Sequence, residues 1–150
     1  MRNSEIYALA AQAHANQVDK LGEPYINHCV RVAISALDNS VMRDSVVFQV
    51  GLLHDVLEDA LTIHELKSRG VDPWVVYLVG QLTRDPSEHY MDYVTRLEKA
   101  EEPARIVKVA DLEDNLNPSR IERLAKKDSV TAARLIKKYQ SAYNILKRTL

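Results

Sequence analysis

Four prolines in this chain each follow a polar residue that can cap or turn a helix. They form the pairs Glu23-Pro24, Asp72-Pro73, Glu102-Pro103 and Asn117-Pro118. Proline is favoured in the first turn of a helix, where its missing N–H costs nothing, and it interrupts a helix that would run through it. Apolar residues recur at helical spacing through most of the sequence, which has only four glycines. The pattern therefore predicts an all-α protein, a bundle of about eight or nine helices.

Capping residues and prolines also predict where these helices begin and end. Thr62 and Glu65 have the spacing of a capping box, and Asp128 is a good N-cap for a long final helix. Trp74 is expected in the core. The basic side chains of the final helix, Lys138 among them, are expected on its solvated face. We expect helices over residues 4–18, 44–59, 73–82 and 103–115, and helices that begin near Pro24, Thr62, Ser87, Pro118 and Asp128.

Composition limits the class of protein. At 150 residues, 46% of them apolar and 27% charged, residues 1–150 read as a single globular domain. The net charge of −1 gives no basic field to attract nucleic acid or an anionic membrane. No apolar run approaches the roughly 20 residues of a membrane span. The single cysteine, Cys29, excludes an internal disulfide, so we expect a cytoplasmic protein with Cys29 in its core.

Residues 48–59 carry the strongest chemical pattern, an apolar helix that reads FQVGLLHDVLED. In one continuous helix, His54 would lie over Glu58 and Asp55 over Asp59. Buried ionisable groups must be compensated, either by pairing or by a metal ion. A His-Asp pair taken alone is more often a structural hydrogen bond. The three acidic residues here nevertheless favour a cation.

Further polar residues stand on other predicted helices. His28 lies in the first turns of the second helix, and Lys108, Asp111 and Asn115 share one face of the 103–115 helix at i, i+3 and i+7. That row is either an ion pair with a polar neighbour or a metal ligand between two groups suited to phosphate. His14 alone is more often a hydrogen-bonded core residue. Contact of His14, Arg84, Tyr90 and Tyr93 with a ligand is left open by the sequence.

Three segments together show a family resemblance. Residues 22–28 read GEPYINH, residues 52–59 read LLHDVLED and residues 107–115 read VKVADLEDN. Their H…HD…D pattern resembles the HD-domain metal-dependent phosphohydrolases. The segments are similar to the (p)ppGpp hydrolase domain of RelA/SpoT proteins and to the small stand-alone SpoT-homologue hydrolases. The resemblance runs from about residue 14 to residue 115.

The resemblance implies a fold and a metal. It implies an HD-domain helical bundle in which four residues bind one divalent ion, namely His28, His54, Asp55 and Asp111. In the (p)ppGpp hydrolases this ion is typically Mn²⁺. Two imidazoles and two carboxylates also suit Fe²⁺, Co²⁺ or Mg²⁺.

The resemblance also implies roles for other residues. Glu58 and Asp59 match the acidic pair that orients and activates the attacking water in that family. Lys20, Lys108 and Asn115 match positions that line the nucleotide and phosphate pocket. The expected partner is therefore a small phosphorylated, nucleotide-like substrate.

The chain departs from the family where a base is recognised. The alarmone hydrolases carry an Arg-Arg-Lys stretch before the Gly-x-Pro-Tyr turn, and this chain has Val18-Asp19-Lys20. An arginine that stacks on guanine is therefore missing, and a carboxylate at Asp19 would repel phosphate. Ala60 stands where the family usually has Thr, and the synthetase half is absent, so the chain should not make (p)ppGpp.

Three functions remain open from the sequence. The first is a metal-dependent phosphohydrolase that cleaves a nucleotide phosphate ester or pyrophosphate with a metal-activated water, with (p)ppGpp 3′-pyrophosphohydrolase-like activity as one case. The second is a non-catalytic HD sensor that binds metal and nucleotide. The third is a structural helical module whose His and Asp residues only hydrogen-bond. The complete set of ligand positions and the complete acidic pair favour the hydrolase.

Overall fold

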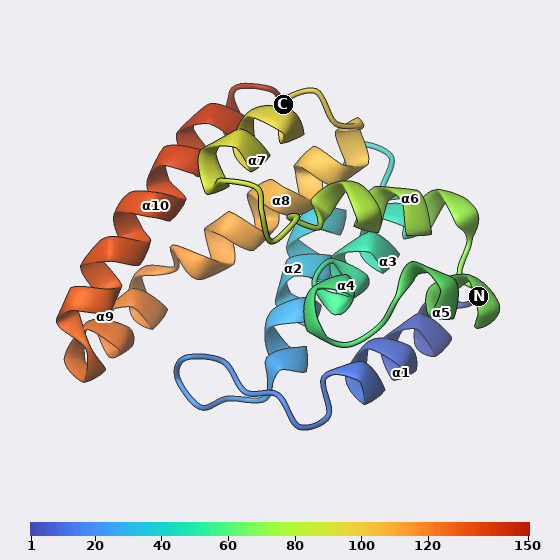
Figure 1. Cartoon of the computed structure of the whole chain (residues 1–150), viewed down its shortest axis with the longest axis horizontal. Coiled ribbons are helices and arrows are strands. Elements are labelled where there is room, and N and C mark those ends of the chain that lie inside the picture. Colours follow the sequence, from blue (N-terminus) through green and yellow to red (C-terminus); the bar gives the residue numbers. More distant parts are fainter.

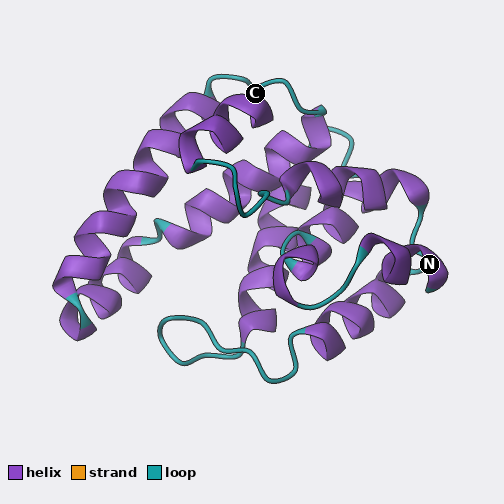
Figure 2. Cartoon of the chain, in the orientation of Figure 1, coloured by secondary structure: helices purple, strands orange, loops and turns teal.

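The chain folds into ten α-helices and confirms the predicted all-α class (Figures 1 and 2). A computed structural model describes residues 1–150, apart from the side chain of Asp59. The bounds are α1 (Asn3–Ala13), α2 (Tyr25–Asn39), α3 (Ser45–Leu53), α4 (Val56–Asp59), α5 (Ile63–Ser68), α6 (Pro73–Leu82), α7 (Tyr90–Leu97), α8 (Glu102–Asn115), α9 (Pro118–Lys127) and α10 (Ser129–Lys147).

Helices α2, α3 and α8 form the centre of the bundle, where each contacts the other two. Helices α1 and α6 pack against α3 on one side, and α10 packs along α8 on the other (Figure 1). Helix α9 leads back from α8 and lies against α10. Among the described residues, no helix is both long and apolar enough to cross a bilayer.

The proline pairs mark helix starts as predicted. Pro73 and Pro118 occupy the first position of α6 and α9. The carboxylate of Asp72 accepts a hydrogen bond from the Trp74 N–H, and the Asn117 side chain accepts one from Ser119, so each preceding residue caps its helix. Trp74 itself was wrongly expected in the core, since it is 42% exposed and stacks on Tyr77.

The helix predicted over residues 44–59 is interrupted at its chemical centre. Helix α3 ends at Leu53, and α4 begins at Val56, so His54 and Asp55 lie in the turn between them. The His54 ring nitrogen Nδ1 lies 2.7 Å from the Gly51 carbonyl and satisfies a carbonyl at the end of α3. The pair therefore does not stack over the acidic residues along one straight helix, and it faces the middle of the bundle instead.

Two other predicted limits were wrong. Helix α1 ends at Ala13 rather than residue 18, so the loop to α2 is longer than expected. Helix α7 begins at Tyr90 rather than just after Ser87. The Asp85 carboxylate accepts hydrogen bonds from the Ser87 N–H and hydroxyl, at 2.8 and 2.6 Å, which forms a turn before the helix.

The loop over residues 14–24 is shaped by a carboxylate and a glycine. Val18 and Pro24 form an isolated antiparallel bridge. Within it, the Asp19 carboxylate accepts hydrogen bonds from the N–H groups of Leu21 and Glu23, at 2.9 and 3.0 Å. Gly22 takes a positive φ of 81°, which a residue with a side chain rarely adopts.

Helices α2 and α3 approach most closely at Gly51. A Cβ atom added there would lie 2.6 Å from the backbone Cα of Ala33 on α2, so no flexible side chain could move aside. Cys29, in the same face of α2, is buried as predicted. This close approach of the two helices fixes where the turn of α2 that carries His28 lies relative to the C-terminal end of α3.

We predict that Gly51→Ala destabilises the fold by about 1–3 kcal/mol, because the new methyl group must separate two packed backbones. The measurement is urea unfolding followed by circular dichroism. Gly80→Ala is the matched control, since a Cβ at this helical glycine meets no atom within 4 Å. That variant should be neutral or stabilised by up to about 1 kcal/mol. Equal stability of the two variants would contradict the close crossing.

Candidate active site

The four side chains predicted as metal ligands come from three segments of the chain and converge at the centre of the bundle. His28 comes from α2, His54 and Asp55 from the turn between α3 and α4, and Asp111 from α8. We call these four residues the His-Asp cluster. Asp111 Oδ1 lies 3.0 Å from His28 Nε2 and 3.5 Å from His54 Nε2. Asp55 Oδ2 lies 3.0 Å from His54 Nε2 and 3.9 Å from His28 Nε2.

The His-Asp cluster has the donors that a divalent metal ion needs. One atom each from His28, His54 and Asp111 lies within 4.8 Å of the other two, and all three residues are buried. Asp55 lies beside these three residues, with its Oδ2 3.0 Å from His54 Nε2. Nitrogen and carboxylate oxygen donors that converge on one point, on three different helical segments, suit a first-row transition metal.

The ring of His54 provides the test of fit. Its Nδ1 is engaged with the Gly51 carbonyl, so Nδ1 carries the proton and Nε2 presents a lone pair. That buried Nε2 finds no hydrogen-bond partner of suitable geometry among the described groups, although two carboxylates face it. Burial disfavours the charged ring, yet Asp55 and Asp111 raise the pKa of His54 well above its ordinary value. The two carboxylates therefore favour positive charge at Nε2, which either a proton or a bound metal ion can supply.

The ring of His28 is oriented from behind by a carboxylate. Its Nδ1 lies 2.7 Å from Asp114 Oδ2, so Nε2 points toward the cluster. Asp114 in turn accepts two hydrogen bonds from Arg31, at 2.7 and 3.1 Å. Burial opposes ionisation of Asp114, but the His28 and Arg31 hydrogen bonds hold its pKa at about 2. A carboxylate behind a histidine is the usual support of a metal ligand.

Tyr25 and Asp114 were missed at the sequence level. The Tyr25 hydroxyl donates to Asp55 Oδ2 over 2.5 Å and so fixes the rotamer of that carboxylate. Tyr25 lies one turn before His28 on α2, and Asp114 lies one turn after Asp111 on α8, so helical spacing from a predicted ligand would have found both.

The polar row on α8 is present as predicted. Lys108 Nζ lies 2.8 Å from Asp111 Oδ2, and Asn115 Nδ2 donates to Asp111 Oδ1 at 3.1 Å. Burial opposes ionisation of Asp111, but the Lys108 ammonium and the two histidine hydrogen bonds hold its pKa well below its usual range. The predicted ion pair of this row is thus present, and the role of Asp111 as a metal ligand stays a prediction. The row also brings an ammonium and an amide to the edge of the cluster.

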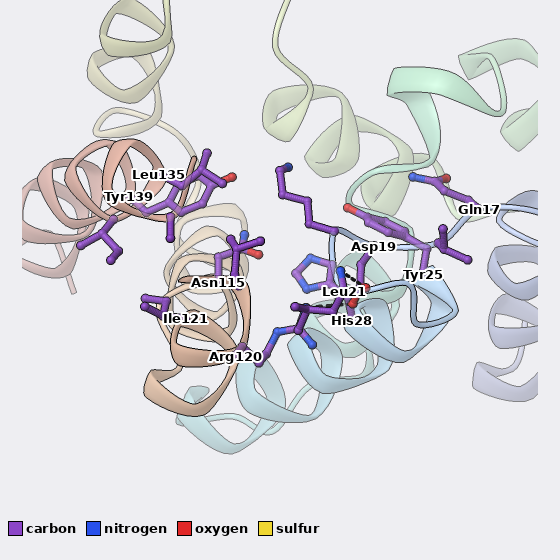
Figure 3. Close-up of a pocket in the computed structure, with 15 residues that line it drawn as sticks. Gln17, Asp19, Leu21, Tyr25, His28, Asn115, Arg120, Ile121, Leu135 and Tyr139 are labelled. Carbon is purple, nitrogen blue, oxygen red and sulfur yellow. Dashed lines mark hydrogen bonds and ion pairs between the residues drawn. The ribbon is translucent and has the colours of Figure 1, made fainter. Parts of the chain in front are cut away.

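Two adjoining cavities open onto the His-Asp cluster, and both are lined by Tyr25, Asn115 and Tyr139. The α9 cavity, of about 310 Å³, lies between the 14–24 loop and the helices α9 and α10. Figure 3 shows it, with Gln17, Tyr25 and Leu21 on one side and Leu135, Tyr139 and Ile121 on the other. The α8 cavity, of about 180 Å³, is lined by three members of the cluster, His54, Asp55 and Asp111, together with Glu58, Arg84, Tyr90, Tyr93, Lys108 and Lys138.

Lys138 was wrongly placed on the solvated face of α10. Its Nζ lies 4.3 Å from the centre of the Tyr90 ring, inside the α8 cavity. Burial and the neighbouring cations Arg84 and Lys108 lower the pKa of Lys138 below its ordinary value. The sequence could have predicted this position from helical spacing. Lys138 lies three residues after Leu135 and next to Tyr139, and both of these line the α9 cavity.

The remaining predicted residues fall in different places. Lys20 and Asn115 line the α9 cavity, and Glu58 is an exposed residue at the α8 cavity. The predicted catalytic side chain of Asp59 lies outside the described residues. His14 lines neither cavity; it is buried behind Tyr25, with ring centres 5.0 Å apart, as expected for a core histidine.

This chain belongs to the HD domain family. The sequence model of that family matches residues 7–112, which include the whole His-Asp cluster. The fold also matches a solved structure of a metazoan SpoT orthologue described as hydrolysing ppGpp. The TM-score is 0.72 with 24% identity, over 98% of this chain and 92% of that one. At this identity the likeness establishes the fold.

Several relatives share one name, guanosine-3′,5′-bis(diphosphate) 3′-pyrophosphohydrolase. The MESH1 protein of Danio rerio is 34% identical over 118 residues, covering 75% of this chain and 66% of that one. The MESH1 protein of Homo sapiens is 34% identical over 114 residues, covering 71% and 63%. The protein of Aquifex aeolicus is 29% identical over 133 residues, covering 83% of this chain and 18% of that one. The chain thus spans 18%, 66% and 63% of the length of the Aquifex aeolicus, Danio rerio and Homo sapiens relatives, in each case less than two thirds.

We predict that Asp114→Asn weakens divalent-metal binding about 10–100-fold, because His28 loses the carboxylate that orients its ring. Isothermal titration of the metal-free protein with Mn²⁺ measures the change. Glu113→Gln is the matched control on the same helix, since Glu113 pairs with Lys147 at 3.7 Å and lines neither cavity. Unchanged affinity in the Asp114 variant would show that His28 does not depend on this support.

Proposed function

We propose that this chain is a metal-dependent phosphohydrolase that cleaves a phosphate ester or pyrophosphate of a nucleotide-like substrate. His28, His54, Asp55 and Asp111 hold one divalent ion, with Mn²⁺ as the first candidate and Fe²⁺, Co²⁺ or Mg²⁺ as alternatives. The observation that supports this most is the histidine geometry. Both Nδ1 atoms are engaged, with Gly51 and Asp114, so both Nε2 atoms turn to the same point beside two carboxylates.

When bound, the ion lowers the pKa of a water molecule and polarises the phosphoryl group. The residues of the chain supply the rest. Tyr25 holds Asp55 in place, and Asn115 holds Asp111. Lys108 neutralises part of the carboxylate charge at the cluster, and it reduces the repulsion that an approaching phosphate would meet.

Glu58 is proposed as the group that accepts the proton of the attacking water. It lines the same cavity as His54, Asp55 and Asp111, and a glutamate carboxylate can act as a general base. The paired role of Asp59 is proposed from the family resemblance alone. Phosphate oxygens are proposed to contact Lys108 and Asn115, with Lys20 reaching the substrate from the exposed loop.

The first candidate substrate is ppGpp, with cleavage at its 3′-pyrophosphate, because the relatives carry that name. The pairing of Asp19 supports this choice, because it reduces the repulsion of phosphate expected from that carboxylate. Its carboxylate is bound by Arg120 at 2.9 Å and by the N–H groups of the loop. The stacking arginine is nonetheless absent, so other phosphorylated nucleotides belong to the proposal. A reducing, cytoplasmic setting is part of it too, from the single buried Cys29.

We predict that Glu58→Ala lowers kcat about 10²–10⁴-fold while Mn²⁺ remains bound, because the variant loses the proton acceptor and keeps the ligands. His54→Ala should lose the metal and the activity together. Metal content by inductively coupled plasma mass spectrometry, measured beside turnover, separates the two effects. Glu98→Ala, an exposed glutamate that lines neither cavity, is the control. Full metal occupancy in His54→Ala would refute the ligand assignment.

We also predict that the protein loaded with Mn²⁺ releases pyrophosphate from ppGpp and that a chelator abolishes the release. The assay measures phosphate and pyrophosphate from ppGpp, pppGpp, NADPH, dNMPs and dNTPs. Release from other nucleotides alone would keep the hydrolase and reject ppGpp as its substrate. Nucleotide binding without release from any of them would favour the non-catalytic sensor.

A further inference from the structure

The α9 cavity lies between two elements whose cavity-facing residues are outside the hydrophobic core. One wall is the 14–24 loop, which contributes Val18, Lys20 and Leu21. The opposite wall includes α9, which turns Ile121 and Leu124 to the cavity and has no fully buried residue. None of these residues belongs to the described hydrophobic core. Something other than core packing must therefore fix the distance between the walls.

Ion pairs and a hydrogen bond join the two walls. Arg120 Nη2 lies 2.9 Å from Asp19 Oδ2, and Arg120 Nη1 lies 3.5 Å from Glu23 Oε2. One turn along α9, Arg123 Nη2 lies 2.8 Å from the other oxygen of Glu23. Lys127 Nζ then donates to the carbonyl of Lys20 at 3.3 Å. We call these contacts the α9 strap.

The centre of the α9 strap is shielded from water. The Arg120 side chain is 17% exposed and that of Asp19 is 8% exposed, whereas the Lys126–Glu122 pair on the outer side of α9 is 77% and 71% exposed. Exposed pairs contribute little, but removing one partner of a shielded pair leaves an uncompensated charge. Burial opposes ionisation of Asp19, yet Arg120 and the loop N–H groups keep its pKa below the usual value. Figure 3 shows Arg120 reaching from α9 toward the loop.

The α9 strap comes near only one residue that supports the His-Asp cluster, namely Asp114, which orients His28. Arg120 Nε lies 4.0 Å from Asp114 Oδ2, a distance without a hydrogen bond. Asp114 has two hydrogen bonds to Arg31 and a contact with His28 that do not involve Arg120. Loss of Arg120 should therefore change the cavity and leave the metal ligands in place.

We infer that Arg120 is a positioning residue for the substrate, which acts through Asp19 and Glu23. It holds the 14–24 loop at a fixed distance from α9, and so sets the width of the α9 cavity and the place of Lys20 beside it. The part of the substrate that lies away from the metal then meets two walls already in position, which reduces the ordering cost of binding. The inference rests on the proposed function for the nature of that substrate.

The test uses Arg120→Met in the full chain loaded with Mn²⁺. We expect KM for ppGpp to rise about fivefold or more with kcat within about twofold, since substrate placement is lost and the chemistry is kept. The backbone amides of residues 17–24 should exchange hydrogen faster, and Mn²⁺ content should not change. Arg120→Lys keeps one cation near Asp19 and should show an intermediate KM. Lys126→Met, on the exposed side of the same helix, is the matched control with no change in any measurement.

A second variant asks whether Arg120 acts through Asp19. Asn in place of Asp19 keeps an acceptor for the loop N–H groups and removes the charge that pairs with Arg120. Asp19→Asn should raise KM in the same way. The double variant should be no worse than Arg120→Met, because both changes break one interaction. Additive effects of the two changes would overturn the inference.

Two further outcomes would overturn the inference. Loss of Mn²⁺, or a lower kcat at unchanged KM, would mean that Arg120 acts on His28 through Asp114. Unchanged hydrogen exchange of residues 17–24 in Arg120→Met would mean that the α9 strap does not hold the loop. This last measurement needs no turnover. If the wild-type chain does not hydrolyse ppGpp, ppGpp is rejected as its substrate, and the exchange result still shows whether the α9 strap holds the loop.

Discussion

The structure depends on how two buried imidazoles and two carboxylates compensate one another's charge. His28, His54 and Asp111 are each almost fully buried, at 3%, 3% and 5% exposed. Groups of this kind cost several kcal/mol when they are left unpaired. The surrounding residues Tyr25, Lys108 and Asp114 are arranged to meet that cost, each by a hydrogen bond or ion pair to one of the four. They leave the buried His54 Nε2 without a hydrogen-bond partner of suitable geometry among the described groups, and a cation there would also meet the two carboxylates beside it.

That requirement explains the break between α3 and α4. A continuous helix would carry His54 and Asp55 around its axis, about 100° apart, and could not direct both at one point. In the turn, the His54 ring bonds back to the Gly51 carbonyl and its other nitrogen reaches Asp55 of the next segment. The close approach of Gly51 to Ala33 brings the turn beside α2, where His28 stands. Local backbone irregularity and close packing thus serve the same site.

Much of the fold and part of the site followed from the sequence. Capping residues and prolines placed the starts of α5, α6, α9 and α10, because these depend on local hydrogen bonds within a few residues. The break at His54 and the later start of α7 were missed, since at each place a side chain competes with the backbone for a hydrogen bond. The roles of Tyr25, Asp114 and Lys138 were missed because each depends on a residue distant in the chain or on an unpredicted cavity.

The sequence by itself determined the helical class, the helix starts and the residue types of the His-Asp cluster, because periodicity and capping are local properties. The family pattern then predicted which histidines and aspartates belong together. Only the tertiary structure decided that Asp19 is neutralised by Arg120, that Lys138 faces inward, and that α9 and the 14–24 loop enclose one cavity. Those facts depend on contacts between segments distant in the chain, 101 residues apart for Asp19 and Arg120, whose geometry is set by packing.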